Sequence, residues 1–258
     1  MNKVFSILAL LWMLAGTLSA QTVSNLQAGI DCLRTGQRVW NAALMEKARL
    51  EFSAEARRCP GDYVPLYWQS VSEFYLMLYY GLEDSAGYDP VKAKMLLGSA
   101  ERTMNAALDV RPQEAECHAL LSSVYGFRIV MHPLSAIWNG PKVLFLQSKA
   151  LETEPDNPRV CYVIGAGYFR APGFVRNVAK ARELLERANR LFDEKPALAV
   201  ADQPQWGRTE CKGMLGDVYR EEGDTVAARQ FYQAALQINP DYTPAKRGLK
   251  ELEDEKSK

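Results

Sequence analysis

The stretch Gly213–Pro240, GMLGDVYREEGDTVAARQFYQAALQINP, decides the fold of this chain. In its first half Gly216 and Tyr219 stand three residues apart, and in its second half Ala228 and Tyr232 stand four apart. Residues three or four apart lie on the same face of a helix. The stretch therefore predicts two helices, each presenting a small residue and an aromatic ring on one face.

These two helices are predicted to form a hairpin. Gly223 and Asp224 lie between them and favour a tight turn, and Pro240 ends the second helix. Gly216 and Ala228 are small, so the two backbones can approach closely where the helices cross. A single hairpin of this kind cannot bury its apolar face alone, and we therefore expect others to stack against it.

The pattern resembles the tetratricopeptide repeat (TPR), a hairpin of about 34 residues with the signature W-x2-L-G-x2-Y, then A-x3-F, then P. Lys212 stands where the signature has Trp, and Ile164-Gly165 repeats the Leu-Gly step earlier in the chain. The resemblance implies an all-α fold, a right-handed α-solenoid of about five TPR-like helix hairpins over residues 21–258. A polar C-terminal capping helix over residues 243–258 would close the array, as repeat arrays require.

The prolines that close successive units are unevenly spaced. Pro60 and Pro112 are 52 residues apart, and Pro112 and Pro155 are 43 apart, whereas the repeat needs about 34. The small residues at the helix crossings place the extra residues in four insertions, at 82–90, 128–140, 171–175 and 196–208. Three of these four insertions fall between the two helices of a hairpin, so we expect them to gather on one edge of the array. Insertions on one face often form the binding face.

Residues 1–20 have the pattern of a cleavable signal peptide. Lys3 supplies a positive start, residues 4–15 are apolar, and residues 16–20 include the small residues of a cleavage site. The apolar run of about 12 residues is short for a membrane-spanning helix. We therefore expect an exported chain, periplasmic or secreted, without a membrane span after cleavage; an uncleaved membrane anchor is the alternative.

Composition argues against several classes of function. The 258 residues include 31 basic and 31 acidic side chains, so no excess of positive charge indicates a nucleic-acid partner. His118 and His132 form no metal-binding pair, and no Gly-rich phosphate loop or nucleophile elbow is present. We expect no nucleic-acid partner, no metal, no cofactor and no enzymatic activity.

Five cysteines are present without a C-x2-C pair, which argues against a zinc ribbon. Cys32 lies near the start of the first predicted hairpin and Cys59 at its end, so the hairpin could bring them together. A disulfide between them and two independent thiols are both compatible with this placement.

The resemblance places a concave groove on the inner face of the first helices, where such arrays usually bind a peptide or protein segment. Aromatic rings and arginines are typical of binding hot spots. Each ring has an alternative role in packing between repeats, because aromatic residues at helical spacing are commonly core. The groove residues predicted by spacing are Trp40, Tyr67, Phe74, Tyr75, Phe127, Arg159, Tyr162, Phe169 and Arg170.

The insertion at 128–140 is a second candidate because it is too apolar for a solvated loop. It contains Ile129, Leu134, Ile137 and Trp138. It either folds onto the groove as a plug or presents an apolar patch to a partner, and the rarity of large exposed apolar patches favours the plug.

These observations predict a non-enzymatic protein–protein interaction module, a scaffold or adaptor that binds a protein or peptide partner in the aromatic groove. The alternative from another class is an envelope-glycan or small-ligand binding protein that uses the rings as stacking platforms. A degenerate enzyme is a third alternative.

Overall fold

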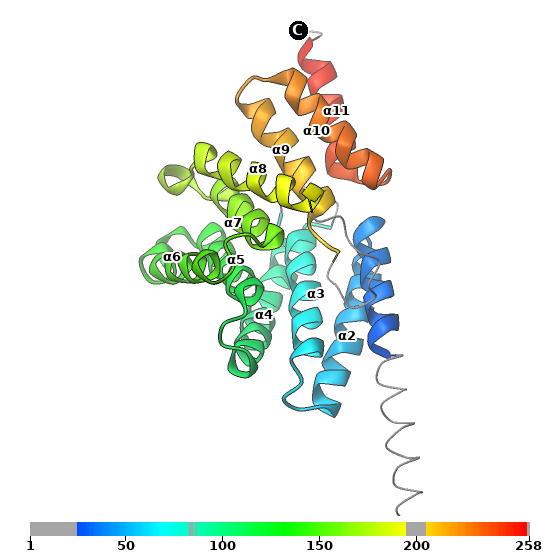
Figure 1. The fold of residues 1–258 in the computed structure, drawn as a ribbon, viewed down its shortest axis with the longest axis vertical. Coiled ribbons are helices and arrows are strands. Elements are labelled where there is room, and N and C mark those ends of the chain that lie inside the picture. The colour runs from blue at the N-terminus through cyan, green and yellow to red at the C-terminus, as the bar shows by residue number, and fades with distance from the viewer. Residues whose placement is uncertain (1–24, 83–84, 86, 195–204, 257–258) are drawn as a thin grey trace, which may run out of the picture.

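The computed structural model describes residues 25–82, 85, 87–194 and 205–256, and within these ranges it contains helices and turns but no strand (Figure 1). The predicted signal peptide lies outside the described residues. In chain order the helices are one over residues 25–38, then α2 (Ala42–Arg58), α3 (Tyr63–Gly81), α4 (Pro90–Val110), α5 (Ala115–Met131), α6 (Ala136–Thr153), α7 (Pro158–Arg170), α8 (Val178–Glu194), α9 (Arg208–Glu221), α10 (Thr225–Ile238) and α11 (Thr243–Lys256), with short 3-10 turns η1 (Pro133–Ser135) and η2 (Gly173–Val175).

The helices pack as consecutive hairpins. Within each hairpin α3 contacts α4, α5 contacts α6, α7 contacts α8 and α9 contacts α10, while α11 packs on both α9 and α10. The first helices of successive hairpins also contact one another, from α3 through α5, α7 and α9 to α11. This arrangement confirms the predicted α-solenoid with its C-terminal helix.

Side-chain caps fix where several helices begin. Asp62, Asp89, Asn157 and Asp224 each accept a hydrogen bond from backbone N–H groups in the first turn of the helix that follows. These N–H groups have no partner within the helix, so an oxygen at the N-cap stabilises the start. The short polar links between these helices thus fix where each of the four helices begins.

The C-terminal hairpin is built around the ring of Tyr232, which is fully buried. A methyl group added to Gly216 of α9 would overlap this ring, and so would one added to Gly248 of α11. The Tyr232 hydroxyl donates to Asp217 at 2.7 Å. One ring therefore fills the space between three helices, and this explains the small residue at the Leu-Gly step.

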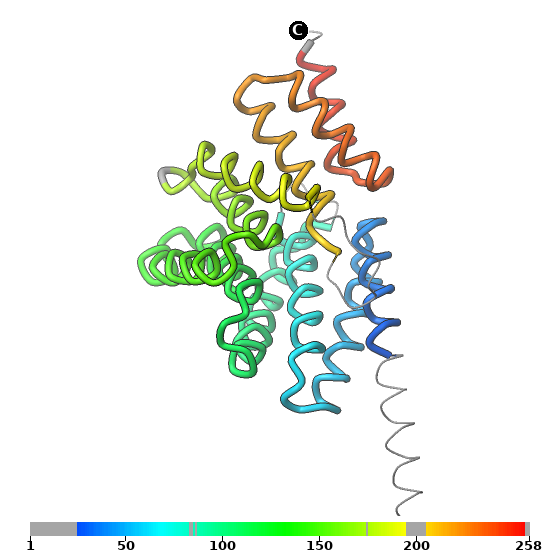
Figure 2. Tube along the Cα trace, in the orientation of Figure 1, coloured from blue at the N-terminus to red at the C-terminus, as the bar shows by residue number. Residues whose placement is uncertain are grey.

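The array curves until its first and last units meet. Asn239 Nδ2 donates to the carbonyl oxygen of Arg38 at 3.0 Å, and the Arg38 guanidinium lies 3.4 Å from Asp241. Figures 1 and 2 show the turn between α10 and α11 beside the helix over residues 25–38. The curvature narrows the concave side of the solenoid.

The 128–140 insertion differs from its predicted form. An insertion that ends at residue 140 implies a second helix that starts at Pro141, but α6 begins at Ala136 and contains Pro141 in its interior. The insertion is therefore the end of α5, the η1 turn and the start of α6. Pro141 and Ile137 are both exposed, so water can hydrate the Ile137 carbonyl that loses its helical partner.

The Cys32–Cys59 disulfide is not formed; both are free thiols. The Cys32 thiol donates to the Leu44 carbonyl oxygen near the start of α2, whereas Cys59 caps the other end of that helix. At about 1.5 Å per residue, these two ends of α2 are roughly 22 Å apart. Cys32 and Cys59 therefore lie at opposite ends of α2, too far apart to form a disulfide.

Gly216→Ala should lower the free energy of unfolding by about 1–3 kcal/mol, because its methyl group would overlap the buried Tyr232 ring. Gly126→Ala is the matched control, since Gly126 also lies in a helix but has open space around its Cβ position. It should be neutral or raise the free energy of unfolding by about 0.5–1 kcal/mol. Equal shifts for the two variants in urea denaturation would contradict the packing described around Tyr232.

Candidate functional site

Four of the predicted groove rings lie under a tryptophan from a distant part of the chain. Trp206, just before α9, packs its ring 6.1, 6.2 and 6.5 Å from the rings of Phe74, Tyr75 and Tyr162, measured between centroids. Its indole N–H donates to the Tyr67 hydroxyl at 2.9 Å. All five side chains are buried.

These four rings therefore do not line an open groove in this structure; they form part of the core. The sequence favoured the 128–140 insertion as the plug of the concave face. Trp206 of the 196–208 insertion fills the space instead, and residues 195–204 lie outside the described part of the chain. The sequence feature that could have indicated this role of Trp206 is a single tryptophan in an insertion otherwise poor in large apolar residues.

A buried ion pair lies beside the Trp206 ring. Glu116 of α5 accepts hydrogen bonds from Tyr67 at 2.5 Å, Asn157 at 2.8 Å and Arg159 at 2.7 Å. Burial raises the pKa of Glu116, but the Arg159 guanidinium and these donors outweigh it and hold the pKa below its ordinary value. The Arg159 guanidinium also lies 5.9 Å from the centroid of the Trp206 ring. Arg159 is thus committed to an internal network that orders the first helices.

An open cleft crosses the first helices of the last three units. Its volume is about 560 Å³, and it contains two of the predicted groove residues, Phe169 and Arg170 at the end of α7. The other residues that line it come from the α7–α8 connection, α9 and α11. They are Arg176, Asp217, Arg220, Glu221, Arg247, Glu251 and Glu255.

Most charges in the cleft are already paired. Arg176 forms a two-pronged ion pair with Glu221 and lies over the Phe169 ring, and Arg220 lies 2.5 Å from Glu251. Arg170 is exposed and forms no ion pair with any residue in the described part of the chain. Among the described residues of the cleft, Arg170 therefore presents an exposed guanidinium without an ion pair beside the half-buried ring of Phe169.

The other predicted site residues lie elsewhere. Phe127 is half-buried, with its ring 3.1 Å from the position that a methyl group on Gly81 would take, so it packs between α5 and the end of α3. Trp40 is also half-buried and donates to Ser85 at 3.4 Å. Trp138 is 68% exposed on α6, so this part of the insertion presents an apolar surface instead of folding onto the groove.

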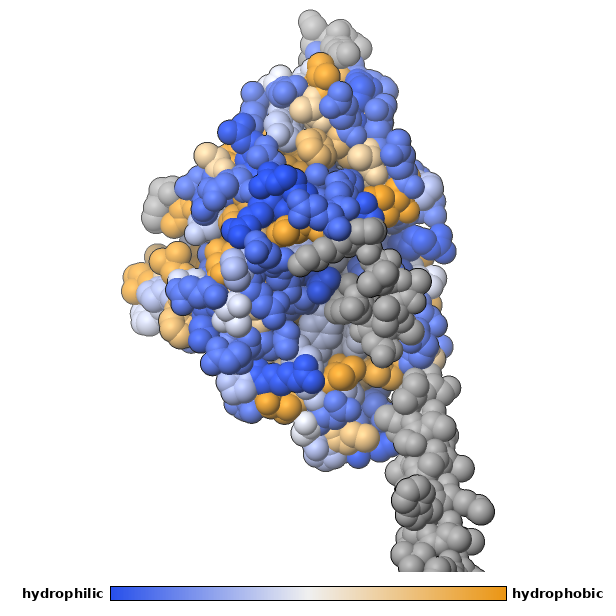
Figure 3. Space-filling view, viewed as in Figure 1, coloured by the Kyte–Doolittle hydropathy of each residue, from blue (hydrophilic) through white to orange (hydrophobic). Residues whose placement is uncertain are grey.

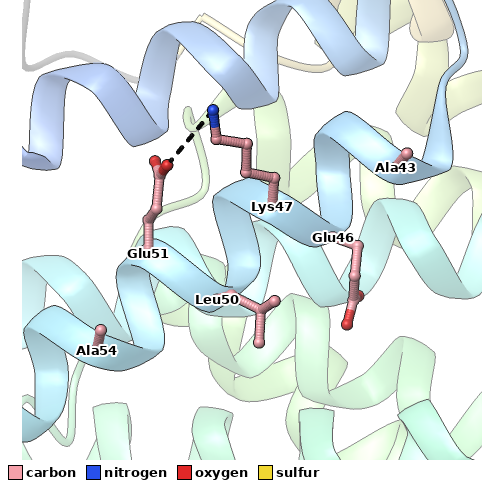
Figure 4. Close-up of a pocket in the computed structure, with 6 residues that line it drawn as sticks. All are labelled: Ala43, Glu46, Lys47, Leu50, Glu51 and Ala54. Atoms are coloured by element: carbon pink, nitrogen blue, oxygen red, sulfur yellow. Dashed lines mark ion pairs between the residues drawn. The ribbon is translucent and has the colours of Figure 1, made fainter.

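A shallow depression of about 530 Å³ lies on α2, lined by Ala43, Glu46, Lys47, Leu50, Glu51 and Ala54. Figure 4 shows these six side chains on successive turns of one helix, with Lys47 4.0 Å from Glu51. No second element supplies a converging group among these six, so the depression is weaker than the cleft as a candidate site.

Within the described ranges, no three His, Cys, Asp or Glu side chains are grouped so that they could hold a metal ion. None of the helices in these ranges is both long enough and apolar enough to cross a membrane.

No protein-family model matches the chain. Among curated proteins, the uncharacterized protein ycf37 of Pyropia yezoensis is 48% identical over 42 residues, which is 16% of this chain and 24% of the relative. The match therefore spans about a quarter of that relative's length.

Two solved structures share the arrangement of helices over most of their lengths. The HusA haemophore from Porphyromonas gingivalis aligns with a TM-score of 0.61 and 18% identity, covering 77% of this chain and 93% of HusA. TTC0263, a thermophilic TPR protein of Thermus thermophilus, aligns with a TM-score of 0.60 and 16% identity, covering 87% of this chain and 98% of TTC0263. The chain has the tetratricopeptide-repeat fold. In TPR terms, the cleft crosses the first helices of the two last repeats and the capping helix.

Trp206→Ala should lower the free energy of unfolding by about 3–5 kcal/mol, because it would leave a cavity among four buried rings. Trp138→Ala is the matched control: its side chain is exposed, and the change should stay within about 0.5 kcal/mol. Guanidinium denaturation of both variants measures the difference. A Trp206→Ala cost no larger than that of the control would show that Trp206 does not complete the core.

Proposed function

We propose that this chain is an exported, non-enzymatic TPR module that binds a segment of a partner protein in the cleft between α7, α9 and α11. The TPR fold supports a protein-interaction role in general. The observation that carries the site is Arg170, an exposed guanidinium without an ion pair among the described residues, in a cleft whose other arginines contact carboxylates.

The chemistry of the cleft selects for one kind of segment. Arg170 offers a charge-assisted donor for a carboxylate, and Phe169 beside it offers an apolar contact. The paired charges around them provide a polar rim, and interfaces typically combine such a rim with an aromatic or arginine anchor. A partner segment with an acidic side chain next to an apolar one fits best.

The proposed location outside the cytoplasm rests on residues 1–20 alone, with their positive start, apolar run and small residues before Gln21. The chain then works in the periplasm or as a secreted protein, and an uncleaved anchor would hold it at the membrane.

A small-ligand function is the second candidate, because HusA, which shares the fold, is a haemophore. Four of the rings expected to act as stacking platforms for a glycan or small ligand are covered by Trp206. A ligand there would have to replace the Trp206 ring. Titration with haem tests this candidate directly, and an unchanged haem absorbance spectrum on adding the chain would contradict it.

Arg170→Ala should reduce partner capture about thirtyfold, which corresponds to the binding hot-spot scale of about 2 kcal/mol. The tagged chain is expressed in its own cells, and the proteins captured from the envelope fraction are quantified by mass spectrometry. Arg57→Ala on α2, where Arg57 is also exposed, is the control and should leave capture unchanged. Thermal melting of both variants should match that of the parent.

The salt dependence provides a second reading of the same experiment. Because an exposed ion pair is screened by salt, capture by the parent should fall as ionic strength rises, and Arg170→Ala should show a weaker dependence. An Arg170→Ala variant that folds and captures every protein at the parental level would show that the cleft is not the binding site.

A further inference from the structure

The outer face of α6 carries a group of large apolar side chains that nothing in the described chain covers. Leu134 of η1 and Ile137, Trp138, Leu144 and Phe145 of α6 are each between 62% and 83% exposed. Figure 3 shows apolar surface at the left edge of the molecule, where Figure 1 places α6. We call these five residues the α6 patch.

Helix geometry explains why these residues share one face. At 100° per residue, Ile137, Leu144 and Phe145 point within about 100° of one another, and Trp138 flanks them. The opposite face of α6, with Leu146 and Ala150, is buried. The contact of α6 with the next unit is sparse compared with the packing of α4 on α5 or α8 on α9. The patch is therefore left outside the array.

The α6 patch is a short ridge on one helix and the turn before it. The twelve positions from Leu134 to Phe145 span roughly 16 Å along this ridge.

The chemistry around the patch matches a lipid surface. Interfacial helices combine Trp, Phe and Leu on one face with lysines beside them, and Trp prefers the boundary between headgroups and acyl chains. Lys142 and Lys149 flank the patch, and α6 has no acidic residue before Glu152. Lys142 is exposed, and its ammonium lies 4.7 Å from the centroid of the Tyr125 ring. The nearby Arg128 pairs with Glu101 and adds no net charge.

We propose that the α6 patch docks the protein onto an anionic membrane surface, with the apolar side chains entering the headgroup boundary and Lys142 facing the lipid phosphates. A convex ridge suits this occupant because lipids reshape around it, whereas a protein partner must offer a matching groove. The helix lies on the bilayer without crossing it. This inference is independent of the cleft and of the partner proposed for it.

Vesicle co-sedimentation tests the inference. The purified chain is mixed with vesicles of phosphatidylcholine containing 30% phosphatidylglycerol, or of phosphatidylcholine alone. The double variant Trp138→Ser/Phe145→Ser should bind the anionic vesicles at least fivefold more weakly than the parent. Val91→Ser/Met95→Ser on α4 is the matched control, because these side chains are 69% and 73% exposed, and it should bind like the parent. Lys142→Gln should weaken binding to the anionic vesicles only.

All variants carry the same N-terminus, so the apolar run at residues 4–15 cannot produce a difference between them. Circular dichroism and thermal melting confirm that each variant is folded. The inference is overturned if the parent binds neither kind of vesicle, or if the control loses as much binding as the α6 variant. It is equally overturned if size-exclusion chromatography shows a parental dimer that the α6 variant converts to a monomer, because the patch would then join two copies.

Discussion

The structure depends on the contact of one ring, Trp206, with aromatic residues on the first helices of two repeats that are separated by a third in the chain. Phe74 and Tyr75 lie on α3, Tyr162 lies on α7, and the Trp206 indole bonds to Tyr67. Burial of several aromatic side chains at one point supplies a large hydrophobic contribution. The curvature of the array also brings its first and last hairpins into contact. The described residues therefore make the concave side of the array core near α3 and α7 and leave an open cleft where α7, α9 and α11 meet.

Two surfaces formed by the described residues are candidates for function. The cleft offers Arg170, which has no ion pair among the described residues, beside charges that are paired, and this suits the recognition of an acidic segment. The α6 patch offers apolar side chains without a groove, which suits a soft surface such as a membrane. The cleft and the patch belong to different repeats, so the two roles can coexist on one chain: one surface would hold the protein at a membrane while the other engages a partner.

The sequence predicted the hairpins because each depends on local features: small residues at the crossings, capping side chains before the helices and prolines after them. It placed the start of α11 at Thr243, where the structure has it. It could not place Trp206, because the curvature that brings this residue to α3 is the sum of small rotations between repeats. It misjudged the start of α6, because Pro141 has the pattern of a first-turn proline but lies inside the helix. Spacing predicted Phe169 and Arg170 as groove residues, and both line the cleft, whereas Tyr67, Tyr75 and Tyr162 were predicted in the same way and are buried.

Hydroxyl-radical footprinting read by mass spectrometry tests most directly whether Trp206 and the rings around it are buried. It reports the solvent exposure of individual aromatic side chains in the folded protein. Oxidation should be slow at Tyr75, Tyr162 and Trp206 and fast at Trp138 and Phe145. If Tyr75 and Tyr162 are oxidised as fast as Trp138, the concave face is open in solution, and the core described around Trp206 does not exist.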